Sequence, residues 1–343
     1  MTLPVILAVD GGNSKTDLAL VRVDGQLLAH VRGPLSSPHH IGLDACVDLL
    51  QGMLDEAVWA ARLERNGPRV AEVAEIFLAG VDFPAEEDQL QEAVEARDWA
   101  ASTTVGNDTF AVLRAGTARG WGVAVVCGAG INCVGVAPDG RQLRFPALGA
   151  ITGDWGGGYD VGLAALSSAA RSEDGRGATT SLEHAVPAHF RLQTPLELAE
   201  AIHGGRIAQR RLIELAPVVF AEAAHDSVAA GIVERLAAEV VALARVAITR
   251  LDLGREPVEV LLGGGLLRAG DGRLLGAIEN GLRSLGEQIV VHRTSSPPVV
   301  GAALFGLDAL GASEDAGARV RAELAAAVDS DEDPGVTEEN GDG

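Results

Sequence analysis

The chain has little of several residue types on which whole classes of protein depend. Lys15 is the only lysine among 343 residues, and the balance of 27 basic against 48 acidic side chains gives a formal net charge of -21. Such a charge argues against binding to nucleic acid or to an anionic membrane surface. It does not exclude a nucleotide, because a phosphate site needs local donors and a divalent ion rather than a basic protein.

Cysteine, aromatic residues and long apolar runs are also scarce. The three cysteines, Cys46, Cys127 and Cys133, have neither metal-ligand spacing nor the spacing of a disulfide framework, which suits a reducing compartment. The N-terminus lacks the features of a signal peptide, and no apolar run reaches the roughly 18 residues that span a bilayer. We therefore expect a cytoplasmic protein without membrane or nucleic-acid partners, its α/β core built mainly from Ala, Val and Leu.

Two stretches of the chain follow the same order of strand, glycine turn and return strand. The first runs through 5–10, a turn at 11–16 and a strand at 17–23, and the second through 122–127, 128–130 and 132–137. A length of 343 residues suits two domains. The repeated pattern predicts two similar α/β domains that face each other across a cleft for a nucleotide.

The expected boundaries follow from this repeat. We predict an N-terminal domain over 1–114, completed by a helix at 298–311, a second domain over 115–297, and an acidic, disordered tail over 312–343. Other predicted elements are helices at 43–65 and 85–97, strands at 75–79, 102–105 and 258–262, and a largely helical region over 161–251.

The first glycine turn has the composition of a phosphate site. It reads Asp10-Gly11-Gly12-Asn13-Ser14-Lys15-Thr16. Small residues let backbone N–H groups approach a phosphate, hydroxyls and one cation line it, and Asp10 stands where a magnesium ion would bridge to it. The alternative is a tight turn between two core strands. The P-loop pattern Gly-x4-Gly-Lys-Ser/Thr is absent from the sequence.

A second motif, Gly106-Asn107-Asp108-Thr109, lies between a predicted strand and a helix. A carboxylate in this place can accept the proton of an attacking hydroxyl, the general-base function that kinases need. The alternative is that Asp108 only caps the helix.

The order of these motifs resembles the sugar kinase and actin-like ATPase superfamily, and within it the branch of N-acetylglucosamine kinase and the BadF/BadG/BcrA/BcrD ATPases. The resemblance extends over about residues 3–311. It also rests on the turn at 127–132, the glycine-dense segment at 148–159 and the strand with three glycines at 258–266. It implies an α/β fold of two ribonuclease H-like (actin-like ATPase) domains around a central nucleotide cleft.

The resemblance also implies a reaction and a set of partners. The expected reaction is ATP-dependent phosphorylation of N-acetylglucosamine or glucosamine at a primary hydroxyl, with Mg²⁺ as the metal. The expected partner is a small-molecule amino sugar, and a homodimer is possible because dimers are common among the relatives.

The resemblance assigns roles to individual residues. Asp10 would hold Mg²⁺ and Asp108 would be the general base. The nucleotide would be bound by Gly11, Gly12, Asn13, Ser14, Lys15, Thr16, Gly128, Ala129, Gly130, Gly263, Gly264 and Gly265. The sugar would be bound by Asn107, Asp108, Asn132 and Asp154.

This chain departs from the family pattern at several positions. Ala129 and Ile131 replace two hydroxyl residues of the second phosphate loop, and Trp155 replaces an acid after Asp154. A further carboxylate, Asp82, stands where relatives are serine-rich, and would favour an amine over an acetamide on the sugar. Pro38 takes the place of a sugar-binding asparagine, which leaves His39 or His40 as substitutes, although solvated histidines are the alternative.

Two other functions remain open from the sequence. One is an ATPase that activates a dehydratase or reductase; the relatives of that kind hold an iron–sulfur cluster through paired cysteines. The other is a non-catalytic protein that binds nucleotide or sugar without reaction.

Overall fold

The computed structural model describes residues 4–65 and 67–332 and divides the chain into two compact units. The first unit contains the described residues up to Ala118 and those from Ser296 onward, and the second unit is Arg119–Ser295. The predicted borders at 114 and 297 lie close to these. None of the helices in the described part of the chain is both long enough and apolar enough to cross a bilayer.

The first unit contains a five-stranded sheet in the order β3-β2-β1-β4-β5. Its strands are β1 (Val5–Gly11), β2 (Lys15–Arg22), β3 (Leu27–Pro34), β4 (Ala71–Leu78) and β5 (Ala100–Asn107). The first three strands pair antiparallel, whereas β4 and β5 continue parallel to β1. Strand β1 is buried along nearly its whole length, as expected for a central strand with helices on both faces.

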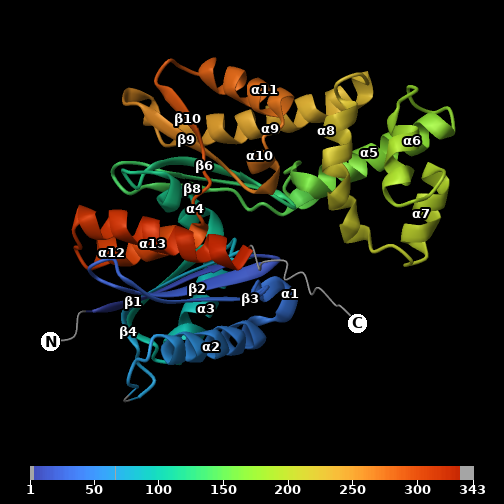
Figure 1. Ribbon diagram of the computed structural model, residues 1–343. Helices are drawn as coiled ribbons and strands as arrows, with labels where there is room; N and C mark the ends of the chain where they lie inside the picture. The colour runs from blue at the N-terminus through green and yellow to red at the C-terminus, as the bar shows by residue number, and fades with distance from the viewer. Residues whose placement is uncertain (1–3, 66, 333–343) are drawn as a thin grey trace, which may run out of the picture. The chain divides into compact units, whose positions relative to one another are not determined.

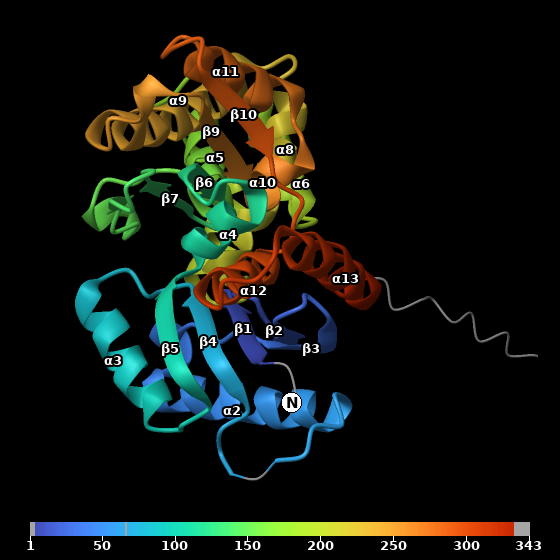
Figure 2. The ribbon, with the colours of Figure 1, turned by 90° about the vertical axis from the view of Figure 1, so that its left-hand side faces the viewer.

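Helices cover both faces of this sheet (Figures 1 and 2). One face packs against α2 (Leu43–Ala60) and α3 (Pro84–Glu95), and the other against α12 (Pro298–Ala309) and α13 (Glu314–Glu332). Two shorter helices, α1 (Pro38–Ile41) and α4 (Asp108–Gly116), complete the unit. The buried positions of α2 recur at helical spacing, which gives the apolar stripe that the sheet covers: Cys46, Val47, Leu50, Met53, Leu54, Ala57 and Val58.

The second unit repeats the topology of the first. Its sheet has the order β10-β9-β6-β7-β8, with β6 antiparallel to β7 and parallel to β9. The strands are β6 (Gly122–Cys127), β7 (Ile131–Val136), β8 (Gln142–Arg144), β9 (Val258–Gly263) and β10 (Ile289–Arg293). Read from β8, each strand therefore has the neighbours and directions of its counterpart in the first sheet, so the prediction of two similar α/β domains is confirmed.

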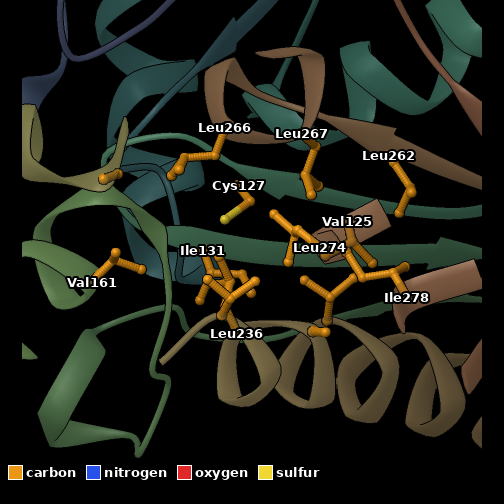
Figure 3. Packing of buried hydrophobic residues seen from close by; sticks show 14 of the residues in the cluster. Val125, Cys127, Ile131, Val161, Leu236, Leu262, Leu266, Leu267, Leu274 and Ile278 are labelled. Atoms are coloured by element: carbon orange, nitrogen blue, oxygen red, sulfur yellow. The ribbon is translucent and has the colours of Figure 1, made fainter. Parts of the chain in front are cut away.

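Helices form the rest of the second unit. They are η1 (Gly149–Ile151), α5 (Gly157–Glu173), α6 (Leu182–His189), α7 (Pro195–His203), η2 (Gln209–Leu215), α8 (Ala216–Glu222), α9 (Ser227–Arg250), η3 (Leu253–Arg255), α10 (Gly265–Ala269) and α11 (Gly272–Arg283). The predicted helical region over 161–251 is thus several helices rather than one. Figure 3 shows part of the core that they share with the sheet, in which Leu236 of α9 lies among residues of β6 and β7.

The predicted disordered tail over 312–343 is wrong for most of its length. Residues 314–332 form α13, which packs on α12 and β3. Four apolar residues at intervals of four, Ala316, Val320, Leu324 and Val328, are buried and give this acidic helix a hydrophobic stripe. The prediction of disorder rested on the acidic composition of this stretch and overlooked the spacing of its apolar residues. The remainder of the predicted tail, 333–343, lies outside the described residues.

Close packing of α12 on α4 within the first unit depends on Gly301. A Cβ at this position would lie 1.9 Å from the Ala111 carbonyl oxygen. We expect Gly301→Ala to lower the free energy of unfolding by about 2 kcal/mol, because the two helices must separate. Gly52→Ala on α2 is the matched control, since its Cβ would meet nothing within 4 Å; it should stabilise the protein by about 0.5 kcal/mol. Urea unfolding of both variants measures the difference, and equal stabilities would contradict the packing argument.

Candidate active site

The carboxyl ends of three parallel strands bring the predicted site residues of the first unit to one edge of its sheet. Leu78 of β4 pairs with Gly11 on one side and with Asn107 on the other. The first glycine turn, the loop after β4 and the start of α4 therefore lie next to one another. Such strand ends are where α/β sheets place their ligands.

The first glycine turn is tight and presents polar side chains outward. The Gly12 N–H donates to the Lys15 carbonyl at 2.8 Å, while Asn13 and Ser14 are exposed. The Lys15 ammonium lies 3.8 Å from the carboxylate of Asp17, and its side chain is 44% exposed. This leaves much of the lone lysine accessible to a ligand.

The buried carboxylate of Asp17 interacts with Lys15 of the turn and with two residues of β3. Asp17 is buried, which by itself would raise its pKa, but the His30 ring nitrogen at 3.0 Å, the Arg32 guanidinium at 2.8 Å and the charge of Lys15 lower the pKa overall. Asp17 is therefore an anion that orients the cations of β2 and β3. Asp10, the predicted metal ligand, is the register partner of Asp17.

Thr16 differs from the other residues of the turn because its side chain points inward. It is fully buried, and its hydroxyl donates to the Pro34 carbonyl at 2.7 Å and lies 2.8 Å from the Ser36 hydroxyl. A Cβ on Gly11 would lie 2.1 Å from the same Ser36 oxygen. Thr16 and Ser36 thus brace the turn, and no sequence motif pointed to Ser36, because its role arises from packing across strands.

The amino end of α4 distinguishes the two polar residues of the second motif. Asn107 is the N-cap: its side-chain oxygen accepts the N–H of Thr109 at 3.0 Å. Asp108 is the first residue of the helix. The residue that caps α4 is therefore Asn107 and not Asp108.

The environment of Asp108 favours a carboxyl group that gains and loses a proton near neutral pH. Burial raises the pKa of Asp108 to about 6, and the nearby charge of Asp82 also raises it. A hydrogen bond from Thr109 lowers this pKa in part. A carboxylate with such a pKa can accept a proton more readily than an ordinary aspartate.

Asp82 lies in the same place, although the motif analysis gave it only a minor role. Its carboxylate accepts a hydrogen bond from the Asn107 side-chain nitrogen at 2.8 Å. The loop that carries it is held by Glu86, whose carboxylate accepts the N–H groups of Asp82 and Phe83 at 2.8 and 2.9 Å. One side chain, Asn107, therefore connects this second carboxylate to the helix on which Asp108 stands.

His39, one of the two histidines considered for the sugar, also belongs to this group. Its ring nitrogen lies 2.9 Å from the Glu86 carboxylate, and one ligand atom each of His39, Asp82 and Glu86 lies within 4.8 Å of the others. The fold thus brings together three titratable side chains that are separated in the sequence: His39 of α1, Asp82 of the loop between β4 and α3, and Glu86 of α3.

Three glycine turns meet within the second unit. The N–H groups of Gly158 and Tyr159 donate to the carbonyls of Gly128 and Ala129 at 2.8 and 3.0 Å, which fixes the start of α5 on the second phosphate turn. A Cβ on Gly157 would lie 2.4 Å from Gly130, and both Gly157 and Gly264 have positive φ.

The turn at 263–265 approaches the same place. A Cβ on Gly264 would lie 2.4 Å from the Cys127 carbonyl oxygen, so only glycine permits this contact. The sequence singled out Gly128, Gly130, Gly263, Gly264 and Gly265 as separate nucleotide contacts, and the fold collects them around one end of β6.

The two departures in the second phosphate turn have different surroundings. Ile131 is buried in the hydrophobic core, as Figure 3 shows, and lies against Gly156. Ala129 is exposed, and Asn132 accepts the N–H of Cys133 with its side-chain oxygen at 2.7 Å. At position 131 this chain therefore has an apolar core residue where the family pattern has a hydroxyl residue.

The segment with Asp154 is shaped by contacts within the second unit. The Asp154 carboxylate accepts a hydrogen bond from the Thr152 hydroxyl. The guanidinium of Arg235 lies 3.9 Å from the centre of the Trp155 ring, a cation–π contact. Trp155 therefore packs against α9 on at least one face.

All three cysteines are core residues. Cys46 lies in the first unit and Cys127 and Cys133 in the second, each fully buried. Burial raises the pKa of Cys46 and of Cys127 to about 12, and that of Cys133 further still. Buried thiols in their protonated form are poor metal ligands, which speaks against the cluster-bearing activator.

Sheet topology and glycine turns together define a protein of the sugar kinase and actin-like ATPase fold. The chain belongs to the BadF/BadG/BcrA/BcrD ATPase family, whose model matches residues 7–306. This confirms the family inferred from the sequence motifs.

Two curated proteins and a solved structure illustrate the similarity. The chain is 26% identical over 266 residues to the N-acetylmuramic acid/N-acetylglucosamine kinase of Clostridium acetobutylicum, covering 76% of this chain and 85% of that protein. It is 24% identical over 230 residues to the N-acetyl-D-glucosamine kinase of Dictyostelium discoideum, covering 65% of this chain and 72% of that protein. A crystal structure of a proposed N-acetylglucosamine kinase from Chromobacterium violaceum has a TM-score of 0.69 at 24% identity, covering 88% of this chain and 98% of the other, and supports the fold.

Proposed function

We propose that this protein is an ATP-dependent amino-sugar kinase that phosphorylates N-acetylglucosamine or glucosamine at a primary hydroxyl. The observation that carries the proposal is the position of Asp108, beside the Asn107 cap and on the sheet edge shared with the first glycine turn. Family membership and the activities of the two curated relatives support it.

In the proposed reaction, the sugar hydroxyl oxygen forms a bond to the γ-phosphorus of ATP. The bond between that phosphorus and the bridging oxygen breaks, its electron pair goes to ADP, and the hydroxyl proton passes to the Asp108 carboxylate. A pKa near 6 leaves most of this carboxylate unprotonated at neutral pH.

The first turn fits a magnesium–phosphate group by the chemistry of its donors. Ser14 and Asn13 are exposed, Lys15 is partly exposed, and Asp10 is the last residue but one of β1. Magnesium bound there would neutralise charge on the phosphates. Within this set we assign phosphate contacts to the backbone of Gly11 and Gly12 and to the exposed side chains, and a bracing role to Thr16.

The remaining contacts are proposed from the second unit. Its glycine turns, 128–130 and 263–265, would bind the nucleotide through backbone groups, and Ile131 would support the turn from the core. Asn132 and Asp154 would bind sugar hydroxyls. A homodimer and a cytoplasmic location remain predictions.

A coupled assay of ADP release across amino sugars and neutral hexoses tests the proposal. Sugar-dependent ADP release with a phosphorylated sugar product is expected. ADP release regardless of sugar would favour the ATPase activator, and binding without ADP would favour the non-catalytic protein.

A further inference from the structure

We propose that Asp82 recognises a positively charged amino group on the sugar, so that the preferred acceptor is the free amine, glucosamine, rather than its N-acetyl derivative. This inference rests on the proposed kinase function and deepens it by choosing between the two sugars. Asp82 is a specificity residue in this scheme, and Asp108 remains the base.

The first step of the argument is the connection between the two carboxylates. Asn107 donates to Asp82 with its side-chain nitrogen at 2.8 Å and accepts from the Thr109 N–H with its oxygen at 3.0 Å. Both ends of this amide are therefore used, and it holds Asp82 beside the first turn of α4, where Asp108 lies. A sugar whose hydroxyl reaches Asp108 must pass close to Asp82.

The second step is that Asp82 is held in place before any ligand binds. Glu86 accepts the N–H groups of Asp82 and Phe83, which fixes the backbone of the loop, and Asn107 fixes the side chain. Gly80, at φ +79°, lets the loop pack closely on Ser37 and His39. A carboxylate ordered in advance loses little entropy on binding a cation.

The third step concerns charge. Besides Asp82 and Asp108, the carboxylate of Glu86 lies within 4.8 Å of Asp82, and that of Glu87 approaches Gly106, next to Asn107. The imidazole of His39, bonded to Glu86, is the other titratable group of this cluster. A concentration of carboxylates around a sugar site favours a cationic substrate over a neutral one.

The charge of Asp82 also acts on the proposed base. It contributes to the raised pKa of Asp108, so a bound ammonium group that neutralises Asp82 would lower this pKa again. The amine would then bind to Asp82 and increase the unprotonated fraction of Asp108, while making Asp108 a somewhat weaker base. An acetamide lacks the charge, and its carbonyl oxygen is repelled by a carboxylate.

The test compares kcat/KM for glucosamine and for N-acetylglucosamine in the wild type and in Asp82→Asn, at a pH where the amine is protonated. Asparagine keeps an oxygen for the Asn107 hydrogen bond, removes the negative charge and replaces the second carboxylate oxygen with an NH2 donor. We expect the wild type to prefer glucosamine and the ratio of the two kcat/KM values to fall about 10- to 100-fold in the variant, as for the loss of a charge-assisted hydrogen bond. Asp82→Ser is a second variant and should change the ratio in the same direction.

The matched control is Asp88→Asn, an exposed aspartate of α3 whose replacement removes the same charge from the neighbouring helix. It should leave the ratio unchanged, and the melting temperature of each variant reports on folding. A wild-type preference for N-acetylglucosamine, or an unchanged ratio in Asp82→Asn, overturns the inference while the kinase function stands. An equal loss on both sugars in a folded variant also overturns it, because Asp82 would then act only through the base. Absence of sugar-dependent ADP release in the wild type overturns both proposals.

Discussion

Asp108→Asn is expected to lower kcat by on the order of 10² or more, with little change in the KM for ATP. The amide keeps the size of the side chain but cannot accept the hydroxyl proton. The cap of α4 is provided by Asn107, so the helix should form normally in the variant. A loss of turnover without a loss of structure therefore isolates the chemical step, and steady-state kinetics with a melting curve measure both.

The pH profile provides an independent test of the same residue. Because burial raises the pKa of Asp108 to about 6 and only the unprotonated form accepts a proton, kcat/KM should fall as the pH is lowered through about 6. N-Acetylglucosamine is the suitable substrate, since its nitrogen does not titrate in this range. Asp82→Asn should move the fall to lower pH by removing a neighbouring negative charge.

Asp88→Asn serves as the control for charge here too and should retain wild-type turnover. If Asp108→Asn turns over as fast as the wild type, Asp108 has no part in the reaction and the kinase mechanism loses its base.

Glu75→Gln is expected to raise the free energy of unfolding above neutral pH by about 3 kcal/mol. Glu75 lies on β4 and is 5% exposed. Burial raises its pKa from 4.5 to about 7. A hydrogen bond from Thr104 lowers this pKa, and the charge of Asp308 raises it. The folded state therefore holds a proton that the unfolded chain releases above about 4.5. Stability from this group is fully present below that pH and is lost as the pH rises through about 7, at about 1.4 kcal/mol per pH unit between the two values.

Denaturant unfolding from pH 5 to 9 measures this effect. The difference between Glu75→Gln and the wild type should grow toward pH 7 and then level off. Glu72→Gln, an exposed glutamate on the same strand, should follow the wild type at every pH. A constant difference between Glu75→Gln and the wild type would show that Glu75 is ionised throughout.

Much of the fold follows from local sequence signals. The strands at 5–10 and 122–127, each followed by a glycine turn and a return strand, predicted both sheets, because continuous apolar runs and turn chemistry act over a few residues. The short strand β10 was missed, since its five partly exposed residues carry no clear period. The helix α13 was missed because its acidic composition outweighed a stripe of four apolar residues.

The candidate site divides in the same way. Asp108 and the glycine turns were found from motifs, because their chemistry depends on residue type at a fixed spacing. The inward direction of Thr16 and the part played by Ser36 were not predicted, since both depend on how β2 meets the end of β3. The roles of Asn107 and Asp108 at the start of α4 were also undecided, because either residue can cap a helix.

The sequence by itself determined the two α/β repeats, the glycine turns and an aspartate suited to be a base, since these features depend on neighbours along the chain. Only the tertiary structure decided that Asp82 lies beside Asn107 and Asp108. Asn107 is 25 residues further along the chain than Asp82. Parallel pairing of β4 with β5 brings their ends together, and the resulting burial and charge set the pKa of Asp108. Electrostatic interactions depend on distance in space, which spacing along the chain does not specify.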